Sequence, residues 1–213
     1  MNILAVGAHW DDIELGCSLT LKKLGEKGHK IFTVVVCSSQ YGKNEDEGMN
    51  EDNALEYGLK SFGMMGANYI PTEKEPNSKL VYGKKIMQEL EEIASNNKID
   101  GVFTHWFGDV NTDHKAVWEI SRTAFRNIKN CFMYQSNSYS DNVDVFKPNF
   151  YFGFSNEEYG MKEKFLSQYE NEWSRRKDRW SREIFERERY WGHVSGNDYA
   201  EGFQTGKLVD FLV

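Results

Sequence analysis

The sequence predicts a three-layer α/β/α fold with a mainly parallel sheet. Short apolar segments alternate with longer amphipathic segments over the first 125 residues, as in sheets whose strands are joined by helical crossovers. Residues 30–36 (KIFTVVV) are β-branched and almost wholly apolar, which is typical of a strand covered on both faces. The length of 213 residues fits one domain, so we expect a single domain over residues 1–213.

The elements of the first half follow from the spacing of apolar residues. Residues 2–7 form a short apolar run, and apolar residues then recur at helical spacing from Ile13 to Leu24, before Gly25 and Gly28. The following elements are expected to be a strand at 30–36, a polar loop at 38–48, a helix at 51–62, a strand at 67–71, a helix at 84–95, a strand at 99–105 and a helix at 113–125. This alternation predicts a Rossmann-like arrangement with helices on both faces of the sheet.

The second half of the sequence is less regular. Residues 131–135 and 149–154 read as strands, and residues 157–191 are densely charged and mostly helical. Residues 192–206 are rich in glycine and are expected to form a loop. We find no internal repeat and no long linker that would mark a domain boundary.

Charge, hydropathy and cysteine content argue against several classes of protein. The net charge of -7 and the pI near 5.3 argue against a nucleic-acid partner, because phosphate contacts need a basic surface. No run approaches the ~18 apolar residues of a transmembrane helix, and the N-terminus reads as a strand rather than a signal peptide. Three widely spaced cysteines form no disulfide framework. We therefore expect a reduced, cytoplasmic protein without a membrane span.

Residues 8–12 (AHWDD) are the first cluster of candidate catalytic or metal-binding residues, and they lie where the first predicted strand ends and the first predicted helix begins. Ligands bind at the carboxyl ends of strands in open parallel sheets. One histidine and two aspartates there can supply two metal ligands and a free base, and nitrogen and oxygen ligands suit Zn²⁺. The alternative is a capping box, with Asp11 as the N-cap and Glu14 as its partner.

The second cluster, residues 104–114 (THWFGDVNTDH), is expected at the same edge of the sheet. His114 can be a third protein ligand with Asp113 beside it, and three ligands with an open position are typical of catalytic zinc. The alternative is that Asp113 caps the helix and His114 is merely exposed. Because both clusters follow strands, each can supply what the other lacks.

The two clusters resemble the motifs of the PIG-L/LmbE-like family of metal-dependent N-deacetylases. Residues 8–16 (AHWDDIELG) are similar to its first motif, and residues 113–115 (DHK) to the end of its second. Residues 146–151 (FKPNFY) and 199–203 (YAEGF) resemble later segments, so the resemblance covers most of the chain.

The resemblance implies a metal-dependent hydrolase that removes an N-acetyl or other N-acyl group from an amino sugar or its nucleotide, glycoside or lipid conjugate. It implies three metal ligands, His9, Asp12 and His114, and Asp11 as the general base that activates a zinc-held water. The metal is expected to be Zn²⁺, with Fe²⁺, Co²⁺ and Ni²⁺ as alternatives. A catalytically degenerate sugar- or metal-binding member of the same fold is the alternative function.

Three features depart from the family pattern, and one is that no arginine near Glu51 corresponds to the arginine that some members place at the start of the second helix. Trp10 replaces the usual proline, and its indole either walls the pocket against a sugar or packs in the core. Asn111 replaces a histidine that assists at the oxyanion or the leaving group in many members, and asparagine can donate a hydrogen bond but no proton. We count Asp11, Asn111 and Asp113 as the catalytic set. Asp11 then acts as base and acid in turn, or else His105 or His193 contributes.

Further residues near the second cluster are candidates for substrate contact: His105, Trp106 and Asp109. A structural alternative exists for each of them, namely a histidine bonded to a backbone carbonyl, a packed indole and a turn aspartate. The arginines between residues 175 and 189 can meet phosphates of a conjugated sugar, or form salt bridges with the interleaved glutamates on a solvated helix. The aromatic residues of that stretch are candidates for the core or for a subunit interface, and a homo-oligomer, such as a trimer or hexamer, is expected.

Overall fold

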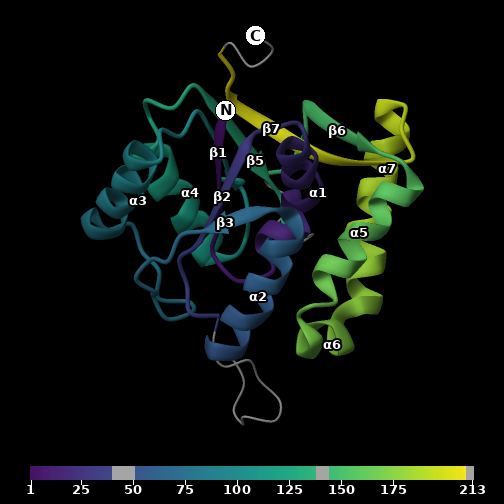
Figure 1. Cartoon of the computed structure of the whole chain (residues 1–213), viewed down its shortest axis with the longest axis horizontal. Helices are drawn as coiled ribbons and strands as arrows, with labels where there is room; N and C mark the ends of the chain where they lie inside the picture. Colours follow the sequence, from purple (N-terminus) through teal and green to yellow (C-terminus); the bar gives the residue numbers. More distant parts are fainter. Residues whose placement is uncertain (40–50, 138–143, 210–213) are drawn as a thin grey trace.

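The computed structural model describes residues 1–39, 51–137 and 144–209, and the sheet within these residues has seven strands in the order β3-β2-β1-β4-β5-β7-β6 (Figure 1). The strands are β1 Asn2–Gly7, β2 Lys30–Val35, β3 Ala67–Tyr69, β4 Gly101–His105, β5 Asn130–Tyr134, β6 Phe150–Phe154 and β7 Tyr199–Lys207. All pairings among β1 to β5 are parallel, whereas β7 runs antiparallel to both β5 and β6. The predicted α/β fold with a mainly parallel sheet is confirmed.

Helices lie on both faces of the sheet (Figure 1). They are α1 Asp12–Glu26, α2 Glu51–Met65, α3 Lys84–Asn96, α4 Thr112–Ala124, α5 Asn156–Leu166, α6 Glu170–Trp180 and α7 Glu186–Ser195, with a π-helical turn η1, Ser181–Phe185, between α6 and α7. None of the helices in the described part of the chain is long and apolar enough to span a membrane.

The prediction of a glycine-rich loop over residues 192–206 is wrong. Helix α7 continues to Ser195, and residues 199–207 form β7, which is hydrogen-bonded on both sides. Tertiary contacts outweigh the low strand propensity of glycine here. At Gly202, a Cβ atom would lie 2.9 Å from Pro148 and 3.0 Å from the Trp191 ring, so only glycine lets the strand pack this closely. Most of the predicted polar loop at 38–48 lies outside the described residues.

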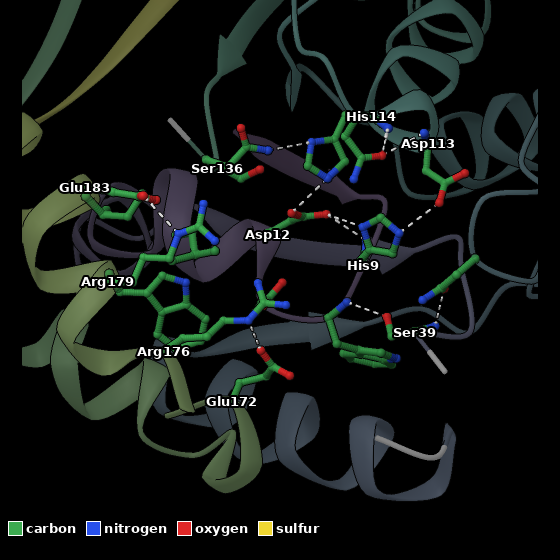
Figure 2. A pocket seen from close by; sticks show the side chains of 18 of the residues that line it. His9, Asp12, Ser39, Asp113, His114, Ser136, Glu172, Arg176, Arg179 and Glu183 are labelled. Carbon is green, nitrogen blue, oxygen red and sulfur yellow. Dashed lines mark hydrogen bonds and ion pairs between the residues drawn. The ribbon is translucent and has the colours of Figure 1, made fainter. Parts of the chain in front are cut away.

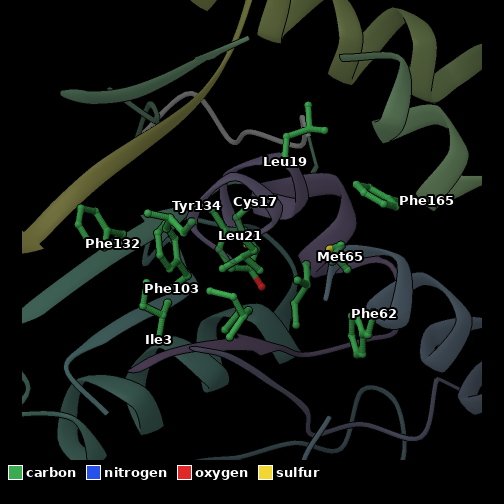
Figure 3. Packing of buried hydrophobic residues seen from close by; sticks show 14 of the residues in the cluster. Ile3, Cys17, Leu19, Leu21, Phe62, Met65, Phe103, Phe132, Tyr134 and Phe165 are labelled. Carbon is green, nitrogen blue, oxygen red and sulfur yellow. The ribbon is translucent and has the colours of Figure 1, made fainter. Parts of the chain in front are cut away.

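Two hydrophobic layers hold the sheet between the helices. One layer joins the sheet to α1, α2 and α5 and contains Phe103, Phe132 and Phe165 (Figure 3). The other joins the opposite face to α3 and α4. Gly16 of α1 lies directly against Tyr134, since a Cβ atom there would be 2.1 Å from the ring. This contact brings the first turns of α1 close to the end of β5.

The topology determines where a site can form. Strands β1 and β4 are neighbours in the sheet, and from them the chain continues to opposite sides, to β2 and to β5. Such a switch point leaves a crevice at the carboxyl ends of the strands. Residues 8–12 follow β1 and residues 106–114 follow β4, so the two predicted clusters lie on either side of this crevice.

Candidate functional site

Three side chains converge at the switch point. His114 Nε2 lies 3.2 Å from Asp12 Oδ1, and His9 Nδ1 lies 3.4 Å from Asp12 Oδ2. One ligand atom from each of His9, Asp12 and His114 falls within 4.8 Å of the others. Figure 2 shows the three side chains pointing toward one another. Two imidazole nitrogens and a carboxylate in this arrangement form a candidate metal site.

The outer nitrogen of each histidine is held by a carboxylate. His9 Nε2 lies 3.0 Å from Asp113 Oδ2, which also accepts a hydrogen bond from the Ser78 backbone N–H at 2.7 Å. His114 Nδ1 lies 2.9 Å from Asp109 Oδ2. Carboxylate–histidine pairs of this kind fix the ring orientation of metal-ligating histidines in proteins. The two carboxylates therefore stabilise the ring orientations in which His9 Nδ1 and His114 Nε2 face Asp12.

The aspartates of the site raise the pKa of both of its histidines above the value of histidine in water. Burial lowers the pKa of His9, but hydrogen bonds to Asp113 and Asp12 outweigh it and raise the pKa to about 9. Burial likewise lowers the pKa of His114, whereas Asp12 and Asp109 raise it to about 10. Burial raises the pKa of Asp12, but His114 and His105 hold it well below its usual range. Such an electrostatic field favours a cation at this position.

Asp11 does not form the capping box that was the alternative to a metal site. It occupies the N-cap position of α1 with φ of 102°, and its side chain makes no cap hydrogen bond. The carboxyl group of Glu14, the other member of the box, accepts a hydrogen bond from Tyr169 at 2.7 Å instead. A left-handed backbone is costly for a residue with a Cβ atom and is concentrated at functional sites. Burial, Asp12 and Glu172 raise the pKa of Asp11 well above its usual range.

Helix α4 is capped by Asn111, so the interpretation of Asp113 as the N-cap is also wrong. The Asn111 side-chain oxygen accepts hydrogen bonds from the backbone N–H groups of Asp113 at 2.9 Å and His114 at 3.4 Å. The backbone N–H of Asn111 donates a hydrogen bond to Asp109 Oδ1 at 2.8 Å. This arrangement sets the first turn of α4, and with it the positions of Asp113 and His114.

The structure places three of the residues predicted to contact substrate away from the cavity, and substrate contact by them stays a prediction. His105, Trp106 and Asp109 are at most 1% exposed, and none of them lines the cavity at the site. Trp106 packs against Phe146, and Asp109 supports His114. His105 ends β4, which is buried along its whole length, and Trp106 and Asp109 are buried in the segment that follows the strand.

Trp10 borders the cavity, but its side chain belongs to the core. The residue is 2% exposed, and its ring packs against Phe62 and Tyr69 with centroids 5.6 Å and 5.1 Å away. A Cβ atom at Gly58 would lie 2.0 Å from the Trp10 ring, so α2 covers the indole closely. The packing alternative therefore describes where the indole lies, and stacking on a sugar stays a prediction.

His105 is the buried, backbone-bonded histidine of the structural alternative. Its Nε2 accepts a hydrogen bond from the Ala8 backbone N–H at 3.0 Å, so the bonded group is an amide and not a carbonyl. Burial and His114 lower its pKa to about 4. Its ring stacks on His114 with centroids 4.0 Å apart. His105 thus fixes the loop after β1 against the second cluster. His193 is exposed on α7 and does not line the cavity.

The cavity at the site has a volume of about 270 Å³, and several of its lining residues were not predicted from sequence. Ser39 follows β2, and Ser136 and Asn137 follow β5, so their positions after strand ends were a usable signal. Asn77 and Ser78 come from an irregular segment, and Glu172, Arg176, Arg179 and Glu183 come from α6 and η1. No local signal in the sequence links these later residues to the strand ends.

The comparisons with known proteins agree with this geometry. The family model described as GlcNAc-PI de-N-acetylase (PIG-L) matches residues 4–125, which is more than half of the chain and includes both clusters. The chain belongs to the PIG-L family of deacetylases. The predicted family membership is confirmed, and the two motifs that indicated it are those that meet at the switch point.

Relatives of this PIG-L protein include curated and solved examples. It is 32% identical over 144 residues to the uncharacterized deacetylase YaiS of Escherichia coli (strain K12), covering 64% of this chain and 75% of YaiS. The conserved protein TT1542 from Thermus thermophilus superposes with a TM-score of 0.80 at 19% identity, covering 99% and 96% of the chains. The N,N'-diacetylchitobiose deacetylase from Pyrococcus horikoshii superposes with a TM-score of 0.77 at 17% identity, covering 96% and 83%. These structural likenesses concern the fold.

Proposed function

We propose that this PIG-L protein is a zinc-dependent hydrolase that removes an acetyl group from the nitrogen of an amino sugar or a sugar conjugate. One observation carries the proposal: His9, Asp12 and His114 converge, and the outer nitrogen of each histidine is backed by a carboxylate. The description of the family model and the substrate named for the Pyrococcus relative both point to N-acetylated amino sugars.

The residues fit a divalent cation. The inner faces offer His9 Nδ1, His114 Nε2 and an Asp12 oxygen, a ligand set suited to Zn²⁺, with Fe²⁺, Co²⁺ or Ni²⁺ as alternatives. Four aspartates, Asp11, Asp12, Asp109 and Asp113, surround the two histidines, so a bound cation would take the place of protons that the raised histidine pKa values otherwise retain. When bound, such an ion polarises the substrate carbonyl and makes water more acidic.

Asp11 is our candidate for the general base. It lines the cavity next to Asp12, but its backbone turns away from the helix that carries Asp12. A carboxyl group whose pKa is raised toward the working pH is a better proton acceptor than an ordinary one. In the proposed reaction, Asp11 takes a proton from the attacking water and returns it to the departing amine.

The remaining catalytic candidates have supporting roles in this proposal. Asp113 positions His9 through its 3.0 Å contact, and its other buried oxygen has no hydrogen-bond partner among the described residues. Asn111 lines the cavity, and its oxygen is committed to the α4 cap, so its amide NH₂ is the group available to a substrate. Asn111 thus positions the second cluster and can donate a hydrogen bond, while Asp11 handles the proton.

The test combines metal analysis with a direct assay. The purified protein is incubated with Zn²⁺, freed of excess metal and analysed for bound metal, and acetate release is measured from N-acetylglucosamine and N,N'-diacetylchitobiose. We expect about one zinc per chain and measurable acetate. Asp12→Ala is expected to lose the metal and the activity together.

Asp11→Asn is the matched variant, since it removes the base but none of the proposed ligands. It is expected to keep the metal and to lose at least ~100-fold in rate, the lower range for general-base catalysis. Normal turnover by Asp11→Asn would remove Asp11 as the base. A wild-type protein that binds no zinc would contradict the hydrolase, and a protein that binds zinc and sugar without releasing acetate would be the degenerate binding member.

A further inference from the structure

A second group of metal-ligating atoms lies beside the proposed zinc ligands. The Sγ atom of Cys37, a carboxylate oxygen of Asp113 and a ring nitrogen of His9 all fall within 4.8 Å of one another. Asp113 makes its 3.0 Å contact at His9 Nε2, the nitrogen that faces away from Asp12 (Figure 2). His9 thus stands between two groups of ligand atoms, and Cys37 belongs only to the outer one.

The sheet places Cys37 here for the same reason that it places the two predicted clusters. Cys37 follows β2, the parallel neighbour of β1, and its backbone N–H donates to the carbonyl oxygen of Ala8 at 2.8 Å. The chain segments after β1, β2 and β4 therefore supply one side chain each, namely His9, Cys37 and Asp113. The carboxyl ends of neighbouring parallel strands meet at one edge of the sheet, so the three side chains converge.

The Cys37 thiol is free, fully buried and surrounded by carboxylates. Burial, Asp113 and Asp12 raise the pKa of the thiol above its usual range, and Lys74 opposes them only in part. The thiol is therefore protonated and a poor nucleophile when no cation is bound. A cation reverses this balance, because it deprotonates a coordinating thiol and is attracted by the same carboxylates that disfavour the free thiolate.

A buried oxygen of Asp113 is a second, independent indication of a ligand. Asp113 Oδ2 contacts His9 and accepts a hydrogen bond from the Ser78 backbone N–H at 2.7 Å. Asp113 Oδ1 is buried as well, but it has no hydrogen-bond partner among the described residues. The nearby Leu80 backbone N–H helps to lower the pKa of Asp113 without satisfying this oxygen. A buried carboxylate oxygen without a partner is costly, and a cation beside Cys37 would supply one.

We propose that Cys37, Asp113 and the outer nitrogen of His9 form a second cation site, the outer site, which binds a thiophilic ion such as Cd²⁺. A thiolate, an imidazole and a carboxylate suit soft and borderline ions, whereas the inner set of two histidines and one aspartate contains no sulfur. Binding releases the thiol proton and the proton held between His9 Nε2 and Asp113, and the cation takes their place. An ion reaches the site through the cavity, which His9 and Asp113 line.

The outer site is coupled to the proposed zinc site through His9. A cation between His9 Nε2 and Asp113 replaces a supporting carboxylate with positive charge, while His9 Nδ1 faces the inner site. Loss of such a carboxylate lowers metal affinity roughly 10–100-fold, and we expect zinc binding to weaken by a similar factor when the outer site is filled. By linkage, zinc weakens the outer site equally. Only the effect on acetate release rests on the proposed function, because binding at Cys37 does not require turnover.

The test titrates Cd²⁺ into the zinc-loaded protein. A thiolate bound to Cd²⁺ has a charge-transfer band in the ultraviolet, so the spectrum reports a cysteine ligand directly. We expect this band in the wild type and in Cys131→Ala, the matched control, since Cys131 is a half-buried free thiol on β5 outside the ligand group. The band is expected to be absent in Cys37→Ala and in Cys37→Ser, which keeps the size of the side chain. No band in the wild type, or an undiminished band in either Cys37 variant, would overturn the proposal.

Zinc content and acetate release, measured before and after addition of Cd²⁺, separate the two possible failures. We expect the ratio of the rates without and with Cd²⁺ to be about tenfold larger in the wild type than in Cys37→Ala, with a matching loss of zinc. A Cys37-dependent band in a protein that releases no acetate would uphold the outer site and contradict the hydrolase. Acetate release and zinc content that Cd²⁺ lowers equally in both proteins would overturn the coupling through His9.

Discussion

Two clusters of buried charge in the described part of the chain are built on opposite principles. In the anchor cluster, Lys162 Nζ donates to Glu188 Oε1 at 2.6 Å and to Glu201 Oε1 at 2.9 Å, and all three side chains are fully buried. Glu201 also accepts from the backbone N–H groups of Leu19 and Thr20 in α1. The ammonium group and the backbone N–H groups hold both carboxylates within the protein, so the cluster joins α5, α7 and β7 to α1.

The cluster of His9, Asp12 and His114 contains no lysine or arginine that would correspond to Lys162 in the anchor cluster. Three aspartates with lowered pKa values, Asp12, Asp109 and Asp113, face only two histidines, so negative charge remains even when the raised pKa values keep both histidines protonated. The comparison teaches that burial of charge alone does not mark a functional site. What distinguishes the two clusters is a surplus of negative charge on an open cavity, as against a closed network of satisfied partners.

His114→Ala is expected to have the largest effect, and it tests whether the cluster of His9, Asp12 and His114 binds a metal ion. Removal of one of three proposed ligands is expected to lower metal affinity by more than about a hundredfold, above the loss typical for outer partners, and to abolish activity with it. His193→Ala is the matched control on exposed α7 and is expected to change neither. Elemental analysis and acetate release check both variants. A His114→Ala protein that still binds one metal ion and is active would show that His114 is not a metal ligand.

Lys162→Met tests the other cluster. Loss of the buried ammonium leaves Glu201 without a charge partner and Glu188 with Arg187 alone, at 3.8 Å, so the free energy of unfolding is expected to fall by about 3–5 kcal/mol. Urea denaturation measures the change, with Lys164→Met on the exposed side of the same helix as the control. A loss no greater than that of the control would mean that the anchor cluster contributes little to stability.

Asp109→Asn probes the support behind the metal cluster. It removes the charge that faces His114 Nδ1 and is expected to weaken zinc binding roughly 10–100-fold, as is usual for carboxylates behind ligating histidines. Competition with a zinc chelator measures the affinity. If affinity is unchanged, the Asp109–His114 pair serves only to pack the loop after β4.

Asn111→Ala is expected to have the smallest effect. Loss of the α4 cap should cost about 1 kcal/mol of stability, because two backbone N–H groups lose their acceptor. The rate is expected to fall less than in Asp11→Asn. Urea denaturation and acetate release are measured on the same preparation. A large loss of rate at unchanged stability would instead make Asn111 a direct contact of the reacting group.

Much of the first half was readable from sequence. The strand at 30–36 and the helix at 84–95 have apolar patterns set by burial of their own side chains, so each could be predicted locally. The clusters at 8–12 and 104–114 could be predicted to meet because both follow parallel strands. β7 could not be predicted from its glycine content, since its conformation is imposed by pairing with β5 and β6.

By itself, the sequence determined the fold class, the family and the two clusters that meet at the switch point. Only the tertiary structure decided which polar side chains of those clusters face the cavity. His105, Trp106 and Asp109 lie in the same short segment as Asp113 and His114, yet only the latter pair lines the cavity. Only the tertiary structure, too, brought Arg176 and Arg179 opposite the strand ends. The physical reason is that residue type and spacing act along the chain, whereas burial depends on packing between elements distant in sequence.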